Sequence, residues 1–279
     1  MGMKSHAHRV YSNSITMMHL KLRHLGIAFA MSLASSGAAY AESPLPLDQS
    51  HSAPSASSPH WGYEGDIRPE KWSELSPEYA GCKIGKNQSP VDIEHTYTTS
   101  LEPLDIHYAI ASQDMVNNGH TIQVTPANDS GYLQLASERY ALKQFHFHSP
   151  SENLIKGKSF PLEGHFVHAD KDGNLLVMAV MFEAGAQNKQ IDVMLNSLAA
   201  VGANKHLNEP VEIDALLPKQ HGYYRFAGSL TTPPCSEGVT WIVLKTPVTL
   251  SQAQIKRFET VLHHNNRPVQ PLNGRLVVD

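Results

Sequence analysis

No apolar run in this chain is long enough to span a bilayer. The run at residues 25–34 is well short of the roughly 20 apolar residues that a membrane-spanning helix requires. An excess of positive charge is missing too, because the formal net charge is −4 at pH 7. Proteins that bind nucleic acid neutralise its phosphates with lysine and arginine. The sequence therefore predicts neither a membrane anchor in the mature protein nor a nucleic-acid partner.

Acidic residues are absent from residues 1–41. The same stretch places basic residues ahead of the apolar run and ends on the small-residue pattern Ala39-Tyr40-Ala41. A basic region, a short apolar core and an A-x-A site are typical of a cleaved secretory signal peptide. Removal of residues 1–41 would take away four lysines and arginines and leave a formal net charge of −8.

Large apolar residues are scarce in residues 42–60, which are rich in serine and proline. This composition predicts a flexible leader. The remaining residues, 61–279, have a length that suits one β-rich domain, and they show no internal repeat. Cysteine is nearly absent, with only Cys82 and Cys235 in the chain. After export to an oxidising compartment, two cysteines predict one disulfide, and two buried free thiols are the alternative.

Strand patterns outnumber helical patterns in residues 61–279. Residues 175–182 and 239–244 are nearly continuous apolar runs, as expected for central strands, and residues 121–124 and 132–135 are shorter candidates. Helical spacing occurs at residues 191–198, and again after a capping box formed by Ser251 and Gln254. Regular βαβ alternation is missing. We therefore expect a mainly β (α+β) single domain with a large, mostly antiparallel central sheet and short peripheral helices.

Two histidines alternate with phenylalanines in residues 144–148. Residues two apart on a strand share a face, so His146 and His148 would project together while the phenylalanines face an apolar side. A third histidine, His165, follows His148 by 17 residues, which fits a hairpin-like return. Three histidines on strands, with one open position, form the ligand set of a catalytic zinc site. Packed core or surface histidines are the alternative.

Gln144 and Glu163 each lie two positions before a proposed ligand, on the same face of the strand. We expect them to accept hydrogen bonds from the ring nitrogens that do not bind the metal, and surface positions are the alternative. The chain has neither the H-E-x-x-H motif of metalloproteases nor a nucleophile elbow.

Short motifs along the chain, which include the histidine segments above, occur in an order that gives the sequence a specific resemblance to the α-class carbonic anhydrases. This resemblance extends from residue 61 to residue 275. The segments that carry it are 60–63, 88–93, 117–120, 144–148, 151–152, 163–165, 228–235, 265–268 and 270–272. The resemblance implies a twisted, mostly antiparallel sheet with zinc at the base of a conical cleft. The ligands of the Zn²⁺ cofactor would be His146, His148 and His165.

The same resemblance implies roles for residues around the metal. Thr231 matches a hydroxyl that accepts a hydrogen bond from zinc hydroxide and donates to Glu152, which aims the hydroxide at the substrate carbon. Thr232 matches a contact to substrate or bicarbonate. His120 matches the proton shuttle, a role that suits imidazole because its ordinary pKa is near neutrality.

The resemblance also implies a water network, an apolar wall and a disulfide. The polar positions that hold the water chain match Tyr63, Asn118 and Gln123, although Gln123 is a longer amide than the asparagine frequent in the family. The wall that receives carbon dioxide matches residues that would otherwise be ordinary core positions: Val167, Val177, Leu230, Val239 and Trp241. Secreted members often carry a disulfide at positions that match Cys82 and Cys235.

The expected function is that of a lyase with a small-molecule substrate. It would hydrate carbon dioxide reversibly to bicarbonate and a proton, by zinc-hydroxide attack with histidine-mediated proton transfer, and weak esterase activity would be a side reaction. We expect a periplasmic bacterial protein that is a monomer or a homodimer. The alternatives are a non-catalytic carbonic-anhydrase-like binding or adhesion module, which would be expected to lose a zinc histidine, and a zinc hydrolase of esters.

Overall fold

One large sheet forms the centre of the computed structural model, which describes residues 60–108 and 111–279. The predicted signal peptide, 1–41, and nearly all of the leader lie outside the described residues. The strands are β1 (Asp92–Ile93), β2 (Asp105–His107), β3 (Ala111–Asn117), β4 (Ile122–Pro126), β5 (Tyr132–Leu135), β6 (Glu138–His148), β7 (Leu154–Ile155), β8 (Leu162–Ala169), β9 (Leu175–Ala184), β10 (Asn204–Glu212), β11 (Tyr223–Ser229), β12 (Glu237–Leu244) and β13 (Val248–Leu250). The α-helices are α1 (Trp72–Leu75), α2 (Gly81–Ile84), α3 (Lys189–Asn196) and α4 (Gln252–Leu262).

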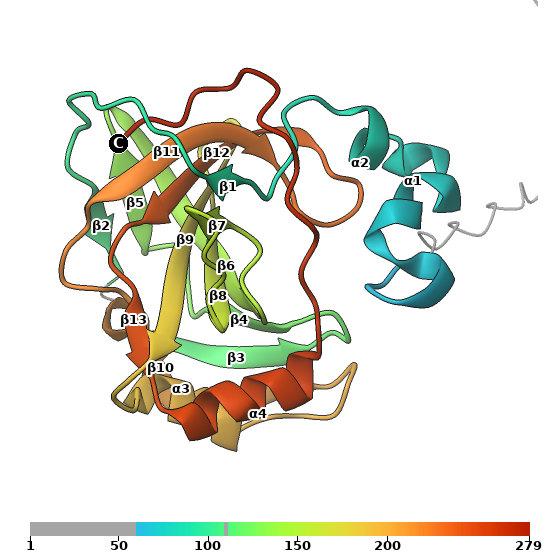
Figure 1. The fold of residues 1–279 in the computed structure, drawn as a ribbon. Helices are drawn as coiled ribbons and strands as arrows, with labels where there is room; N and C mark the ends of the chain where they lie inside the picture. The colour runs from blue at the N-terminus through green and yellow to red at the C-terminus, as the bar shows by residue number, and fades with distance from the viewer. Residues whose placement is uncertain (1–59, 109–110) are drawn as a thin grey trace, which may run out of the picture. The chain divides into compact units, whose positions relative to one another are not determined.

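The main path of the sheet runs in the order β10-β3-β4-β6-β8-β9-β12-β11 (Figure 1). Most neighbours are antiparallel, as predicted, including the pairs β6–β8 and β8–β9. The exceptions in this sheet lie at β9, which pairs in parallel with both β12 and β13. The two apolar runs predicted to be central strands are β9 and β12, and both lie inside the sheet. The expected fold class is therefore confirmed.

Each face of the sheet carries its own apolar cluster. Phe145 and Phe147 of β6 are fully buried in the larger cluster, together with Phe166 of β8. Val177 of β9 and Trp241 of β12 belong to a second cluster on other strand positions. Because strand side chains alternate between faces, the histidines between the phenylalanines point away from the larger cluster. The sheet thus separates a packed apolar side from the side that carries the polar site.

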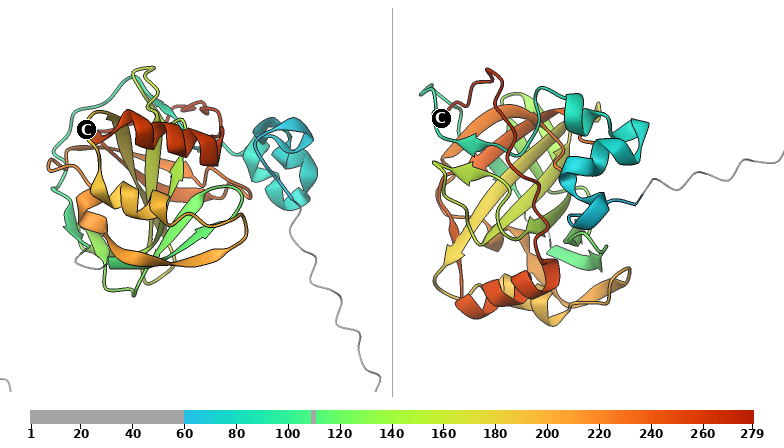
Figure 2. Two further views of the ribbon diagram at one scale, coloured as in Figure 1. Left: turned by 90° about the horizontal axis from the view of Figure 1, so that it is seen from below. Right: turned by 45° about the vertical axis from the view of Figure 1, so that its right-hand side comes forward.

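The two predicted helices are α3 and α4, which lie next to each other at one end of the sheet (Figures 1 and 2). The predicted capping box is present, because Ser251 Oγ accepts from the Gln254 N–H and the Gln254 side chain accepts from the Ser251 N–H. Gln254 also donates to the Asn188 carbonyl and accepts from its N–H, which joins the starts of both helices. The short helices before residue 85 were not predicted.

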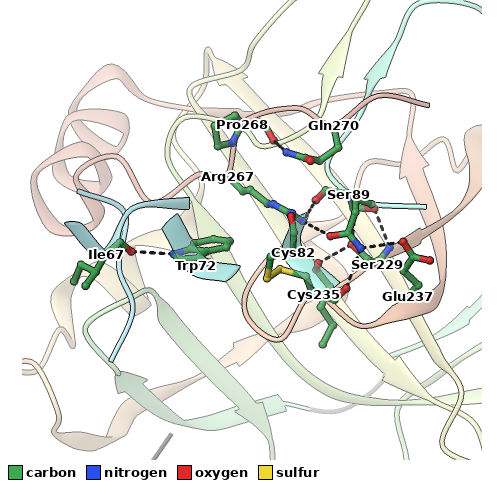
Figure 3. Close-up of a disulfide and its surroundings, with 12 residues drawn as sticks. Ile67, Trp72, Cys82, Ser89, Ser229, Cys235, Glu237, Arg267, Pro268 and Gln270 are labelled. Atoms are coloured by element: carbon green, nitrogen blue, oxygen red, sulfur yellow. Dashed lines mark hydrogen bonds between the residues drawn. A yellow bond between two sulfur atoms is a disulfide. The ribbon is translucent and has the colours of Figure 1, made fainter. Parts of the chain in front are cut away.

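A disulfide joins Cys82 of α2 to Cys235, in the loop that follows β11 (Figure 3). The alternative of two free thiols is therefore wrong. This bond fixes the N-terminal helices to the loop that contains Thr231 and Thr232. Among the described residues, none of the helices combines the length and apolar character that crossing a membrane requires.

Candidate active site

Three imidazoles converge at the middle of the sheet. His146 and His148 lie on β6, and His165 lies on β8, where it pairs directly with His146 in the antiparallel register. One nitrogen from each ring lies within 4.8 Å of the other two. His148 and His165 are each 1% exposed. The alternation of β6 and the β6–β8 register therefore bring together the three residues that the sequence predicted as ligands.

Each imidazole has one outer nitrogen, which points away from the site and forms a hydrogen bond with an acceptor that differs from ring to ring. His146 Nδ1 lies 2.8 Å from Gln144 Oε1, and His165 Nε2 lies 2.9 Å from Glu163 Oε1. Both partners are the ones that strand alternation predicted. His148 Nδ1 lies 2.7 Å from the backbone carbonyl of Asn265. Each acceptor fixes one nitrogen as the donor, so Nε2 of His146, Nε2 of His148 and Nδ1 of His165 remain as acceptors toward the site.

The protonation of these rings fits a metal ion. Burial lowers the pKa of His146, of His148 and of His165 below the ordinary value, so all three stay neutral. Nε2 of His148 is buried, and no residue in the described part of the chain forms a hydrogen bond with it. Three neutral imidazole nitrogens form a ligand set that suits Zn²⁺. The residues present therefore fit the cofactor expected from the sequence.

Glu163 is fully buried and holds more than one group. Besides His165, its carboxylate accepts from the Asn153 side-chain amide at 2.7 Å and from the backbone N–H groups of Glu152 and Asn153 at 2.7 and 2.8 Å. Burial raises its pKa, and the hydrogen bonds from Asn153 oppose that rise. Glu163 therefore holds both His165 and the loop that carries Glu152.

Glu152 lies beside the metal-ligand cluster. Its Oε2 is 3.5 Å from His148 Nε2 and 3.9 Å from His165 Nδ1, and its Oε1 accepts from the Arg267 N–H at 2.7 Å. Burial raises the pKa of Glu152 to about 8, while the Arg267 N–H and the Thr231 side chain lower it. Among the described residues, Oε2 has no hydrogen-bond partner of regular geometry. A cation held by the histidines would favour the ionised carboxylate.

His120 lies in a turn between β3 and β4. The Asn118 side chain accepts from the N–H groups of His120 and Thr121, each at 2.9 Å, which fixes the turn. The imidazole stacks on Trp61, with ring centroids 3.9 Å apart, and its centroid is 6.2 Å from that of His60. Partial burial lowers the pKa of His120, and the neighbouring His60 lowers it further.

The other predicted polar residues lie around the same face. Tyr63 is close enough to Glu152 for the carboxylate charge to add to burial in raising the pKa of the phenol well above its ordinary value. Gln123 on β4 pairs directly with His146 on β6. Thr231 is 5% exposed, and the Thr232 carbonyl accepts from the Cys235 N–H, which closes the loop.

The predicted apolar wall belongs to one cluster. Val177, Val239 and Trp241 are among its buried members, and Val167 and Leu230 pack against it. The Trp241 ring lies edge-on to His165, with centroids 5.0 Å apart, and its Nε1 donates to the Ser229 carbonyl at 2.9 Å. The wall is therefore in contact with the metal-ligand cluster.

Three contacts at the site were not predicted from the sequence: the Asn265 carbonyl on His148, the Arg267 N–H on Glu152, and the Trp61 ring against His120. The first two use backbone atoms, which any residue type possesses. The only signal for them was that residues 265–268 belong to one of the motifs of the resemblance.

Comparison with known proteins gives the family. A family model described as "Eukaryotic-type carbonic anhydrase" matches residues 67–279. A carbonic anhydrase of Pectobacterium atrosepticum is 50% identical over 84% of this chain and 96% of its own length. A carbonic anhydrase of Neisseria gonorrhoeae is 49% identical over 79% of this chain and 88% of its own.

A solved structure shares the fold as well as the sequence. The α-carbonic anhydrase of Thermovibrio ammonificans, in complex with the inhibitor sulfanilamide, is 48% identical with a TM-score of 0.77, over 79% of this chain and 99% of that one. The family-model match, residues 67–279, covers the sheet and all three histidines. The chain therefore belongs to the α class of carbonic anhydrases and is a lyase of that family.

Proposed function

We propose that the chain hydrates carbon dioxide reversibly to bicarbonate and a proton at a Zn²⁺ ion held by His146, His148 and His165. The observation that carries the proposal is the convergence of three neutral imidazole nitrogens within 4.8 Å, with the outer nitrogen of every ring already occupied by an acceptor. Bound Zn²⁺ would supply the Lewis acidity that activates water near neutral pH.

The residues around the ligands would orient the reaction. Thr231, next to the Glu152 carboxylate, would donate to it and so present its own oxygen lone pairs toward the nucleophile. Carbon dioxide would lie against the apolar surface that includes Trp241 and Val177, because that surface offers no competing hydrogen bond to a small apolar molecule. Thr232 would contact the substrate or bicarbonate beside this surface.

His120 would carry the proton away. Its lowered pKa keeps the imidazole largely neutral, so it can accept a proton near neutrality and release it to buffer. Asn118, Tyr63 and Gln123 would hold the water molecules between His120 and the metal, since each brings a polar group to this face. The same site would attack activated esters slowly, as a side activity. A purely binding function is disfavoured because all three metal-ligating histidines are present.

The chain is further proposed to be exported to the periplasm after cleavage behind Ala41. The Cys82–Cys235 disulfide supports export, because disulfides persist in oxidising compartments. Intact-mass measurement of protein from the periplasmic fraction should give a chain that begins at Glu42, and reduction should add the mass of two hydrogens. Uncleaved protein with two free thiols would contradict the proposal.

Replacement of one ligand tests the function. His148→Ala should reduce zinc content well below one ion per chain and lower CO₂ hydration at least about a hundredfold. The two imidazoles that remain do not provide the three protein ligands that the zinc site requires. His206→Ala is the matched control, since His206 is an exposed histidine on β10 paired with Asp114. Stopped-flow hydration assays and metal analysis give both readouts. Normal zinc and normal activity in His148→Ala would overturn the assignment.

A further inference from the structure

Arg267 is a buried arginine whose backbone and side chain hold different parts of the molecule. Its N–H donates to Glu152 Oε1 at 2.7 Å. Its guanidinium donates to the Gln88 side chain at 2.9 Å. It also donates to the carbonyls of Ser89 and Cys82 at 2.8 Å each (Figure 3). The residue is only 2% exposed. Burial of this cation requires that its hydrogen bonds be kept, so the backbone of residue 267 has little freedom to move.

Gln88 continues these contacts toward the Thr231 loop. Its Oε1 accepts from Arg267, and its Nε2 donates to the Cys235 carbonyl at 3.0 Å and to the Glu237 carboxylate at 3.1 Å. Gln88 is 3% exposed, so both ends of its amide are fixed in the interior. Cys235 in turn donates its N–H to the Thr232 carbonyl. A chain of hydrogen bonds, which passes through the Arg267 and Gln88 side chains and then the backbone of Cys235, therefore links Arg267 to the residue next to Thr231.

Space is restricted around Gln88 and its neighbour Ser89. A Cβ added at Gly85 would lie 2.4 Å from Gln88 Nε2 and 2.5 Å from the Glu237 carboxylate, and one added at Gly228 would lie 2.2 Å from Ser89 Oγ. Close packing of this kind restricts the movement of the Gln88 amide. The disulfide holds the same region, because Cys82 accepts from Arg267 and is bonded to Cys235.

Glu152 and Thr231 come from separate parts of the chain, yet their side chains must meet. Glu152 lies in the loop after β6, held by the Arg267 N–H, and Thr231 lies in the loop after β11, held through Cys235. We propose that the buried Arg267–Gln88 pair is a positioning unit that sets the distance between Glu152 and Thr231. Neither residue touches the reacting atoms, and both act through the groups that orient the nucleophile. This inference rests on the proposed function.

A double-mutant cycle separates positioning from simple stabilisation. Arg267→Lys keeps the positive charge, but its donors all lie on one nitrogen, so lysine cannot reproduce the planar fork in which two nitrogens reach Gln88, Ser89 and Cys82. If Arg267 acts through Glu152 and Thr231, Arg267→Lys should lower kcat/KM for CO₂ hydration about tenfold in the native background. In the Thr231→Ala background the same change should lower kcat/KM less than about twofold, because the coupled partner is already gone.

Arg257→Lys is the matched control. The Arg257 guanidinium donates to the Leu195 carbonyl and to the Asn196 side chain, and the hydrogen bonds described for it reach neither Gln88 nor Glu152. Arg257→Lys should change kcat/KM less than about twofold in either background, even where it lowers the melting temperature. Gln88→Ala is a second route to the same loss of coupling, and it serves if Arg267→Lys does not fold.

Two measurements independent of turnover complete the test. Zinc content should stay at one ion per chain in Arg267→Lys, and the amide proton of residue 267 should exchange faster, because the backbone of residue 267 is no longer held by the guanidinium contacts. Equal losses of kcat/KM in both backgrounds, or an equal effect of Arg257→Lys, would overturn the positioning role. If the native protein itself showed no hydration activity, the proposed function would fail instead.

Discussion

At the scale of single residues, the site depends on which nitrogen of each imidazole ring already forms a hydrogen bond outside the site. Gln144, Glu163 and the Asn265 carbonyl hold the outer nitrogens of the three ligands. Burial keeps those rings neutral by lowering their pKa values. His120 differs because it is only partly buried and stacks on Trp61. Under the proposed function, burial distinguishes the proposed metal ligands, which must stay neutral, from the proposed proton shuttle, which must titrate.

Replacement of His120 should separate proton transfer from attack on carbon dioxide. His120→Ala should lower kcat roughly tenfold or more in dilute buffer, because the proton loses its carrier. It should leave kcat/KM for hydration within about twofold, because none of the ring contacts described for His120 reaches the metal-ligand cluster or the apolar wall. Imidazole added as buffer should restore much of the lost kcat by accepting the proton itself.

His60→Ala provides the comparison for this experiment, since His60 is an exposed imidazole beside His120 without a contact to the metal-ligand cluster. It should retain most of the native kcat. A parallel fall of kcat and kcat/KM in His120→Ala, without rescue by imidazole, would place His120 in substrate binding or folding.

At the scale of elements, register is what assembles the ligands. His146 and His165 face each other across β6 and β8, and His148 follows two residues later on the same face. A slip of one residue in this pairing would move the histidines of one strand to the opposite face. The phenylalanines of β6 oppose such a slip, because it would bring them out of the apolar cluster.

The start of α4 allows a comparison between two capping residues. Ser251 caps only its own helix, whereas Gln254 also donates to the Asn188 carbonyl and to Asp192 of α3. Ser251→Ala should lower the free energy of unfolding by about 1 kcal/mol. Gln254→Ala should cost more, about 2–3 kcal/mol, because the partly buried N–H and carbonyl of Asn188 both lose their partner. Urea unfolding of both variants checks this, and equal losses would mean that Gln254 acts within α4 alone.

At the scale of the whole molecule, a buried histidine outside the site is expected to lower stability in acid. His168 on β8 is fully buried. Its Nδ1 forms a hydrogen bond with the Leu176 carbonyl, and its Nε2 forms one with the Tyr108 hydroxyl. Burial lowers the pKa of His168 from 6.5 to about 4. The unfolded chain therefore takes up this proton first, and stability falls as the pH is lowered from about 6.5 toward 4.

Removal of this group should flatten the acid limb. When the pH is lowered from 7 to 5, the free energy of unfolding of the native protein should fall by about 2 kcal/mol more than that of His168→Gln. Both proteins are measured without metal, so that they differ only at His168. His206→Ala, which removes an exposed histidine instead of a buried one, is the control for the substitution. An unchanged slope in His168→Gln would show that other groups dominate acid unfolding.

The sequence by itself determined the features that follow local rules. Strand alternation placed His146 and His148 on one face with Gln144, and the same rule placed Glu163 beside His165. Ser251 and Gln254 were predicted as a cap because three-residue spacing at a helix start is a local constraint. The apolar runs of β9 and β12 were predicted as central strands because a strand buried on both faces excludes polar side chains.

Only the tertiary structure decided the contacts made by backbone atoms between distant segments. The Asn265 carbonyl reaches His148 across 117 residues, and the Arg267 N–H reaches Glu152 across 115. The parallel pairing of β9 with β12 belongs to the same class, whereas the stacking of Trp61 on His120 is a side-chain contact between segments that only the fold brings together. Every residue except proline has both a backbone donor and a backbone acceptor, so residue type does not mark these partners, and the packing of the whole sheet selects them.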